Sequence, residues 1–181
     1  MSIQQAFETS SNVGISSVIV SRYSKNPQAF IDKIKSFGLG SPLGLDIEGE
    51  GTPRIKNITA KDWSSVVSLP WMSIGYETKL TPLQILAFYN AIANNGTMVR
   101  PHFVKEIQSH GRTLKSFDTE IIRDSIASPA ALAKARQLME GVVERGSAKQ
   151  LNSSPYRIAG KTGTAQISMN KFGYDKTHPS Y

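Results

Sequence analysis

The sequence contains no cysteine, and this absence excludes disulfide bonds, thiolate catalysis and cysteine-based zinc sites together. Histidine is scarce as well. The three histidines, His102, His110 and His178, are far apart and flanked by turn-forming residues, which is typical of exposed side chains and not of a metal site. We therefore expect neither a metal ion nor another cofactor. No apolar run approaches the roughly 20 residues that a membrane-spanning helix needs.

The chain also lacks a dense block of basic residues, although its net charge is positive. It has 21 lysines and arginines against 14 acidic residues, which gives a formal charge of +7. A positive balance favours anionic partners, but the basic residues are spread along the sequence. We interpret them as a solvated basic surface and expect no nucleic-acid binding. The length of 181 residues and the hydrophobic content of 39% suit a globular domain with a core.

What the sequence does contain is a mixture of helical and strand-like patterns. Apolar residues recur at helical spacing in several stretches that end at glycine. Asn26 before Pro27 predicts the N-cap of one such helix, and the stretch from Thr81 to Gln84 predicts a capping box at the start of another. Two β-like runs flank Ser109-His110-Gly111 and predict a hairpin within residues 98–117. Residues 38–73 are rich in glycine and proline and predict a long irregular segment. One domain of helices and antiparallel strands, α/β in its α+β form, is the simplest fold. Helices are expected at residues 3–7, 13–23, 27–37, 82–95 and 129–145, the fourth of them central and largely buried, and a strand at residues 157–167.

Two short motifs carry residues suited to catalysis. Ser10-Ser11-Asn12 lies in a predicted loop between two helices, and Lys161-Thr162-Gly163-Thr164 lies on the predicted strand near the other end. A lysine in a confined cationic site shifts toward its neutral form. Lys161 and the Ser10 hydroxyl are therefore candidates for a relay that moves protons to and from a nucleophile and a leaving group. Asn12 can donate a hydrogen bond to a substrate carbonyl and accept one from a catalytic lysine.

The residues that follow Lys161 suggest how a substrate is held. Thr162 and Thr164 are two residues apart, so on a strand their hydroxyls point to the same side and, with Lys161, predict a carboxylate-binding site. Gly163 lets a substrate backbone approach closely, and an exposed strand edge can bind a peptide as an added strand. The Thr164 N–H is a candidate donor to an oxyanion. These considerations predict a cleft that binds and cleaves an amide.

Four segments together resemble the transpeptidase domain of class B penicillin-binding proteins across nearly the whole chain: SSNVG, WMSIGYETKLTPLQILAFYNAIANNG, VVERGSAKQL and AGKTGTAQ. The resemblance implies a penicillin-binding transpeptidase or serine β-lactamase-like fold, present in part as a helical region and part of an antiparallel sheet. It also implies a peptidoglycan D,D-transpeptidase, which forms an acyl-enzyme with the D-Ala-D-Ala end of a stem peptide and transfers the acyl group to an amine of a neighbouring strand. β-Lactams would be bound as mimics of that peptide. By this resemblance Ser10 and Asn12 belong to the second family motif, and Lys161, Thr162 and Gly163 to the third.

The resemblance further implies where such an enzyme works. It would act on the periplasmic or outer face of the cytoplasmic membrane, anchored by an N-terminal segment outside this chain. Proteins of the division or elongation complex would be its partners, and the wording of SSNVG and AGKTGTAQ leans toward a division-type member.

The family's first motif, S-x-x-K, supplies the acylated serine upstream of the second motif. Only nine residues precede Ser10, and they contain no such pattern. The single match in the chain, Ser168 to Lys171, follows the third motif and is interpreted as a chance match. Residues 1–181 are therefore expected to be a partial transpeptidase domain that lacks the nucleophile and the downstream strands. Such a fragment would be inactive by itself, and its unpaired sheet edges would favour self-association.

Two alternative functions remain open from the sequence. One is a D,D-carboxypeptidase or a β-lactamase-like serine acyl hydrolase of the same fold. The other is a non-catalytic module that uses the strand edge and the basic surface to bind an anionic glycan or a partner protein.

Overall fold

A computed structural model describes residues 1–164, which group into two compact units. Of the described residues, the first unit combines 1–11 with 137–164, and the second contains 12–136. Within the part of the chain that the structure describes, no helix has the length and apolar character of a membrane span.

The first unit is built on two helices, α1 (Ile3–Glu8) and the C-terminal half of α6 (Pro129–Glu144). α1 begins with a capping box, in which the Ser2 hydroxyl accepts a hydrogen bond from the Gln5 N–H at 3.1 Å and the Gln5 side chain accepts one from the Ser2 N–H at 2.8 Å. A short 3₁₀ turn, η2 (Lys149–Leu151), follows α6. The core of this unit consists of buried Val142, Val143 and Ala148, with Phe7 and Ile158 packed against them.

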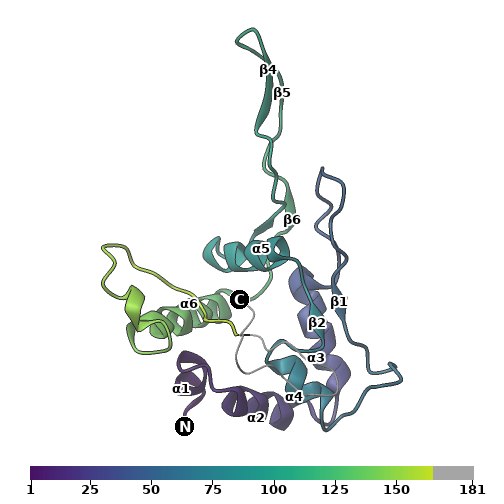
Figure 1. The fold of residues 1–181 in the computed structure, drawn as a ribbon, viewed down its shortest axis with the longest axis vertical. Helices are drawn as coiled ribbons and strands as arrows, with labels where there is room; N and C mark the ends of the chain where they lie inside the picture. The colour runs from purple at the N-terminus through teal and green to yellow at the C-terminus, as the bar shows by residue number, and fades with distance from the viewer. Residues whose placement is uncertain (165–181) are drawn as a thin grey trace, which may run out of the picture. The chain divides into compact units, whose positions relative to one another are not determined.

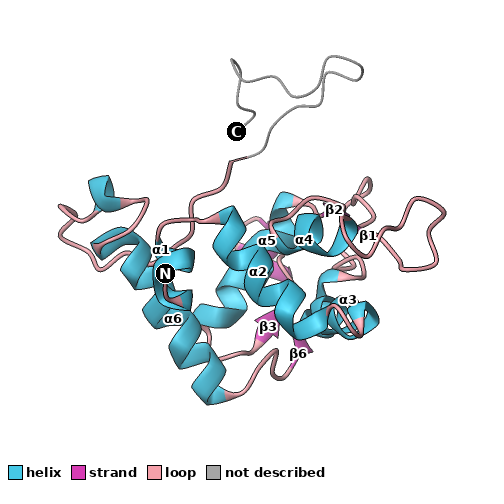
Figure 2. Ribbon diagram, turned by 90° about the horizontal axis from the view of Figure 1, so that it is seen from below, coloured by secondary structure: helices cyan, strands magenta, loops and turns pink. Residues whose placement is uncertain are grey.

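The second unit contains most of the helices and all of the strands that the structure describes (Figure 2). The predicted cap of the third helix is confirmed, because the Asn26 side chain accepts a hydrogen bond from the Ala29 N–H at 3.3 Å. That helix continues into a π-helical turn and ends where Gly38 takes a left-handed φ of 88°. The helical elements are α2 (Asn12–Tyr23), α3 (Pro27–Ile34), η1 (Lys35–Leu39), α4 (Ser68–Ser73), α5 (Pro82–Ala93) and the start of α6.

The strands of the second unit form small antiparallel pairs. β1 (Arg54–Ile55) pairs with β2 (Thr78–Lys79), β3 (Met98–Val99) with β6 (Ile121–Arg123), and β4 (Glu106–Ser109) with β5 (Arg112–Ser116). The predicted hairpin is confirmed as β4–β5, which extends away from β6 and α5 within this unit (Figure 1). His110 and Gly111 form its turn with φ of 49° and 76°, the left-handed values that a tight two-residue turn requires.

α5 shows one confirmed and one wrong prediction. Its capping box is confirmed, since the Thr81 hydroxyl accepts from the Gln84 N–H at 3.2 Å and the Gln84 side chain accepts from the Thr81 N–H at 2.9 Å. The expectation that this helix is largely buried is wrong, because Ile85 is 45% and Leu86 59% exposed. Only the face that carries Gln84, Ala87, Ala91 and Ile92 is buried. Apolar residues on every face of a helix permit its burial, but burial also requires packing partners on each face. The predicted self-association of the chain through exposed apolar surfaces stays a prediction.

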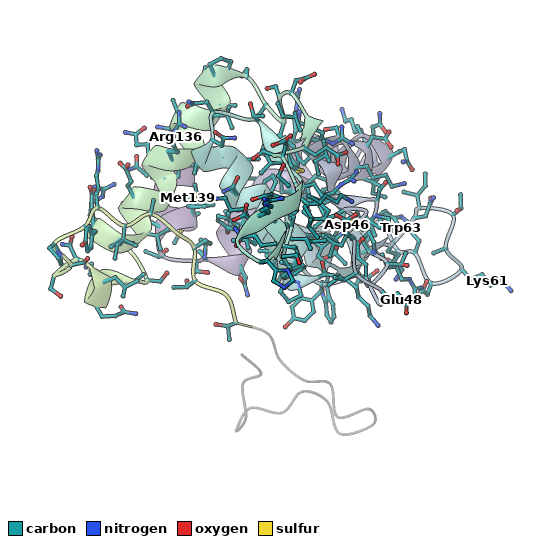
Figure 3. The ribbon with its side chains drawn as sticks, turned by 90° about the horizontal axis from the view of Figure 1, so that it is seen from above. Asp46, Glu48, Lys61, Trp63, Arg136 and Met139 are labelled. Atoms are coloured by element: carbon teal, nitrogen blue, oxygen red, sulfur yellow. The ribbon has the colours of Figure 1, made fainter. Side chains whose placement is uncertain are left out.

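The predicted irregular segment is confirmed between Gly40 and Ser73, where the regular elements are β1 and α4. The Glu50 carboxylate organises its first part by accepting hydrogen bonds from three successive backbone N–H groups, those of Leu43, Gly44 and Leu45. Figure 3 labels Asp46, Glu48, Lys61 and Trp63 in this segment, with Lys61 pointing away from it. The same figure marks Arg136 and Met139 on α6.

The strand expected over residues 157–167 is wrong for the part that the structure describes. Residues 157–164 have no regular secondary structure, and residues 165–167 lie outside the described range. A strand exists only where a neighbouring strand completes its ladder. Here the Gly160 N–H donates instead to the Met139 carbonyl of α6 at 3.2 Å. The alternating pattern therefore reflects a segment that lies against a helix.

Candidate active site

The loop between α1 and α2 holds the Ser10 hydroxyl in a tight turn. The Ser10 N–H donates to the Phe7 carbonyl at 3.1 Å, and the Ser11 N–H donates to the Ala6 carbonyl at 2.8 Å. Ser10 has φ of 57°, a left-handed conformation that is unfavourable for a residue with a side chain. Strain of this kind persists only where surrounding contacts maintain it, and it is concentrated at functional sites.

The Lys161 ammonium lies beside this loop in the same unit. Its Nζ donates a hydrogen bond to the Ser10 Oγ at 2.6 Å, to the Thr162 carbonyl at 3.0 Å and to the Thr162 Oγ1 at 3.4 Å. The Phe7 ring lies under the ammonium, with 5.8 Å between Nζ and the ring centroid. The structure thus brings together Ser10 and Lys161, which the sequence places in two different motifs.

The surroundings of Lys161 shift its protonation equilibrium. Burial removes water from the ammonium and lowers the pKa of Lys161 below its ordinary value of 10.5. Because a lowered pKa makes the neutral amine more accessible, Lys161 is better able to accept and return a proton than an exposed lysine. Its contact with the Ser10 Oγ supplies a path for that proton.

Thr162 is held from a second direction. Its hydroxyl lies 2.6 Å from the hydroxyl of Ser147, which is in the turn that follows α6. The Ser147 N–H in turn donates to the Glu8 carbonyl at 2.9 Å, so that α1, the end of α6 and the Lys161 segment are joined by one chain of hydrogen bonds. Thr162 is half-buried, whereas Gly163 and Thr164 are exposed. Nothing local in the sequence pointed to Ser147.

The loop predicted for Ser10-Ser11-Asn12 is wrong at its last residue, because Asn12 is already the first residue of α2 and belongs to the second unit. It is exposed at a hollow of about 410 Å³, whose other walls include Ser16, Pro70 and Trp71. In the wall of this hollow the Ser16 hydroxyl donates to the Pro70 carbonyl at 3.2 Å. The Ser168 to Lys171 pattern lies outside the described residues.

An ion pair below the Ser10 loop was missed by the sequence reasoning. Glu8 is only 5% exposed, and its carboxylate receives two hydrogen bonds from Arg145, at 2.6 Å from Nη2 and 3.3 Å from Nε. Gln4 adds a third at 2.8 Å. A signal did exist, because an acidic residue in the last turn of a helix opposes the helix dipole. Its presence at the end of α1 therefore calls for a compensating cation.

We expect this ion pair to make stability sensitive to acid. The hydrogen bond from Arg145 is the main reason that the pKa of Glu8 lies below its ordinary value of 4.5. A carboxylate with a lowered folded-state pKa contributes stability that is complete above the unfolded-state pKa and is lost as the pH falls through the folded-state pKa. Urea unfolding between neutral pH and about pH 3 should show stability falling below about pH 4.5. The Glu8→Gln variant should lose less on acidification, and an unchanged pH slope in that variant would contradict the assignment.

Comparison with known proteins places these features in a family. A family model described as the penicillin-binding protein transpeptidase domain matches residues 1–180. Penicillin-binding protein PbpB of Mycolicibacterium smegmatis is 33% identical over 168 residues, which cover 88% of this chain and 25% of that protein. Peptidoglycan D,D-transpeptidase MrdA of Haemophilus influenzae is 32% identical over 149 residues, covering 74% of this chain and 22% of that protein. The chain therefore spans about a quarter of the length of these curated relatives.

Solved structures agree with this comparison. Penicillin-binding protein 3 of Mycobacterium tuberculosis, complexed with aztreonam, matches with a TM-score of 0.79 and 28% identity over 97% of this chain and 40% of that one. A ceftriaxone acyl-enzyme of penicillin-binding protein A from the same organism matches with a TM-score of 0.80 and 26% identity over 94% and 36%. The predicted fold class, a partial penicillin-binding transpeptidase fold, is thereby confirmed. Because the family model covers almost the entire sequence, the chain belongs to the family of penicillin-binding protein transpeptidase domains.

Proposed function

We propose that the chain is part of a peptidoglycan D,D-transpeptidase that cross-links stem peptides during cell-wall synthesis. The observation that carries the proposal is the 2.6 Å hydrogen bond from the Lys161 Nζ to the Ser10 Oγ, which connects one residue of each motif. Family membership and the naming of relatives as peptidoglycan D,D-transpeptidases support it.

The proposed chemistry is acyl transfer through a serine ester. A serine of an S-x-x-K motif, which is not found upstream of Ser10 in this chain, attacks the carbonyl between the two D-alanines. Its proton passes through Ser10 and Lys161 to the nitrogen of the leaving D-alanine. An acceptor amine then attacks the ester, loses a proton to the same relay and forms the cross-link as the serine is released.

Substrate binding falls to the other residues of the same two motifs. We assign the substrate carboxylate to Thr162 and Thr164, and the approach of the substrate backbone to Gly163. The Thr162 hydroxyl is suited to this task because Ser147 already fixes its position at 2.6 Å. Asn12, at the start of α2, is assigned to a substrate amide or carbonyl group.

The complete protein would also react with β-lactams, as the complexes of its structural neighbours with aztreonam and ampicillin suggest. It would work outside the cytoplasm at the membrane surface, in association with a division or elongation complex.

The test uses a fluorescent penicillin, a donor pentapeptide ending in D-Ala-D-Ala and an acceptor amine. The complete protein should be labelled covalently and should convert the donor to an amine adduct that mass spectrometry identifies. Release of free acid alone would instead indicate a carboxypeptidase or a β-lactamase-like hydrolase. The 181-residue chain by itself should remain unlabelled. Labelling that disappears in a Ser168→Ala variant would show that the interpretation of Ser168 as a chance match is wrong.

A further inference from the structure

We infer that Glu8 and Arg145 are positioning residues whose ion pair holds the Ser10 hydroxyl against the Lys161 ammonium. The two residues are far apart in the sequence, and both belong to the first unit. Their catalytic importance rests on the proposed function, whereas the positioning itself is a property of this chain.

The first support is the place of Glu8 in the hydrogen-bond network. It lies two residues before Ser10, and its carboxylate accepts hydrogen bonds from Arg145, at 2.6 Å from Nη2 and 3.3 Å from Nε. Its carbonyl accepts the Ser147 N–H at 2.9 Å, and the Ser147 hydroxyl contacts Thr162. One residue thus links the backbone that carries Ser10 to the segment that carries Lys161.

The second support is the fit of Glu8 against α6 and the turn that follows. A Cβ added to Gly141 would collide with the Glu8 carboxylate, and a Cβ added to Gly146 would collide with the Glu8 carbonyl. Neither glycine has a left-handed φ, so the backbone conformation does not require glycine at these positions. The close approach of Glu8 therefore explains both glycines, and it leaves the α1 terminus little freedom to shift.

The third support is the cost of placing a charge there. A carboxylate that is only 5% exposed is unfavourable unless it is paired and hydrogen-bonded. An apolar residue of similar size would pack without that cost, so stability alone does not account for Glu8. A directional ion pair sets the position of α1 along α6 more specifically than an apolar contact would.

The consequence for the site follows from the strained loop. Ser10 keeps φ of 57° only while its neighbours restrain it. If the ion pair is removed, the loop relaxes, the contact between Ser10 and Lys161 lengthens, and water reaches the ammonium. Because burial is what lowers the pKa of Lys161, that pKa then moves back toward 10.5.

The experiment measures how the reaction of Lys161 with an amine-acylating reagent depends on pH, residue by residue, by mass spectrometry of the 181-residue chain. The wild-type midpoint should lie below 10.5. Glu8→Ala should move it upward. A direct electrostatic effect of removing the Glu8 charge would lower the pKa of Lys161 and move the midpoint downward, so the direction separates repositioning from simple electrostatics. Gly141→Ala should also move it upward, because this change displaces the Glu8 carboxylate without altering any charge.

Glu144→Gln is the matched control. Glu144 is the other carboxylate on Arg145, at 2.5 Å from Nη1, but its side chain is 46% exposed, whereas Glu8 is buried. Its removal should leave the Lys161 midpoint unchanged. Circular dichroism checks that each variant folds. If Glu8→Ala does not fold, Glu8→Gln replaces it in the experiment.

A midpoint that stays in place or falls in folded Glu8 and Gly141 variants overturns the inference. In the complete protein, Glu8→Ala should slow acylation by a fluorescent penicillin about tenfold, since small misplacements of a reacting group cost about 10²-fold or less. If the midpoint moves but the complete protein shows no transpeptidation, the positioning role stands and the proposed function fails. The two claims therefore fail separately.

Discussion

Replacing Lys161 with alanine is expected to slow acylation of the complete protein by at least about 10²-fold, the usual contribution of a positioned acid-base group. The variant loses the hydrogen bond of 2.6 Å to the Ser10 Oγ and the bonds to Thr162. The proton of the attacking serine then has no prepared acceptor. The measurement is the second-order rate constant for labelling by a fluorescent penicillin, followed in time and compared with the wild-type protein.

Lys161→Arg decides what the lysine does. Arginine keeps the positive charge but cannot lose its proton in the accessible pH range, so it cannot act as a relay. If Lys161 relays a proton, Lys161→Arg should be about as slow as Lys161→Ala. If Lys161 only binds a carboxylate, arginine should retain most of the rate. The two roles left open by the sequence are thus separated by one substitution.

Lys149→Ala is the control for these variants. Lys149 is an exposed lysine of the same unit, at the start of η2, and it is outside the proposed site. Its loss should leave acylation within about twofold of the wild-type rate, because an exposed charge outside the site has little effect. A Lys161→Ala protein that is acylated at the Lys149→Ala rate would remove Lys161 from the mechanism.

The second large effect is expected from Gly146→Ala, which should destabilise the chain by about 3 kcal/mol. The new Cβ would collide with the Glu8 carbonyl, and the Glu8 carbonyl carbon and the Val142 Cα lie at 2.7 and 2.9 Å. These are backbone atoms, so no side chain can rotate away. The hydrogen bond from the Ser147 N–H to the Glu8 carbonyl must lengthen as well. Urea unfolding of the 181-residue chain measures the loss.

Gly160→Ala is the matched comparison for that substitution. Gly160 lies in the same unit, and no described atom comes within 4 Å of the position where its Cβ would stand. Its φ is not left-handed, so alanine should change stability by no more than about 0.5 kcal/mol. Equal effects of the two substitutions would show that the close approach at Gly146 is not a constraint on the fold.

Elements with a local chemical signal were predicted well. The capping box at Thr81 and Gln84, the Asn26 cap and the hairpin turn at His110-Gly111 each depend on side chains within a few residues, and each is confirmed. Elements that depend on a distant partner were not. Apolar and polar residues alternate over residues 157–164 as in a strand. The Gly160 N–H nevertheless donates to a carbonyl of α6, and these residues form no strand.

The site shows the same division. Ser10 and Lys161 were selected from the sequence because hydroxyl and amine groups suit proton transfer, and that selection needed only their chemistry. Glu8 and Arg145 were missed, because their meaning depends on a contact between the end of α1 and the end of α6. The burial of α5 was misjudged for a related reason, since Ile85 and Leu86 are apolar but lack neighbours.

By itself the sequence determined the family, the helices that begin and end with local caps, and the residue types available for acyl transfer. Local hydrogen bonds and side-chain chemistry depend on residues that are close in the sequence, so they can be predicted from the sequence alone. Only the tertiary structure decided that Lys161 reaches Ser10, that burial lowers the pKa of Lys161, and that Glu8 lies against Gly141 and Gly146. Those properties depend on distances between segments distant in sequence and on the water excluded between them.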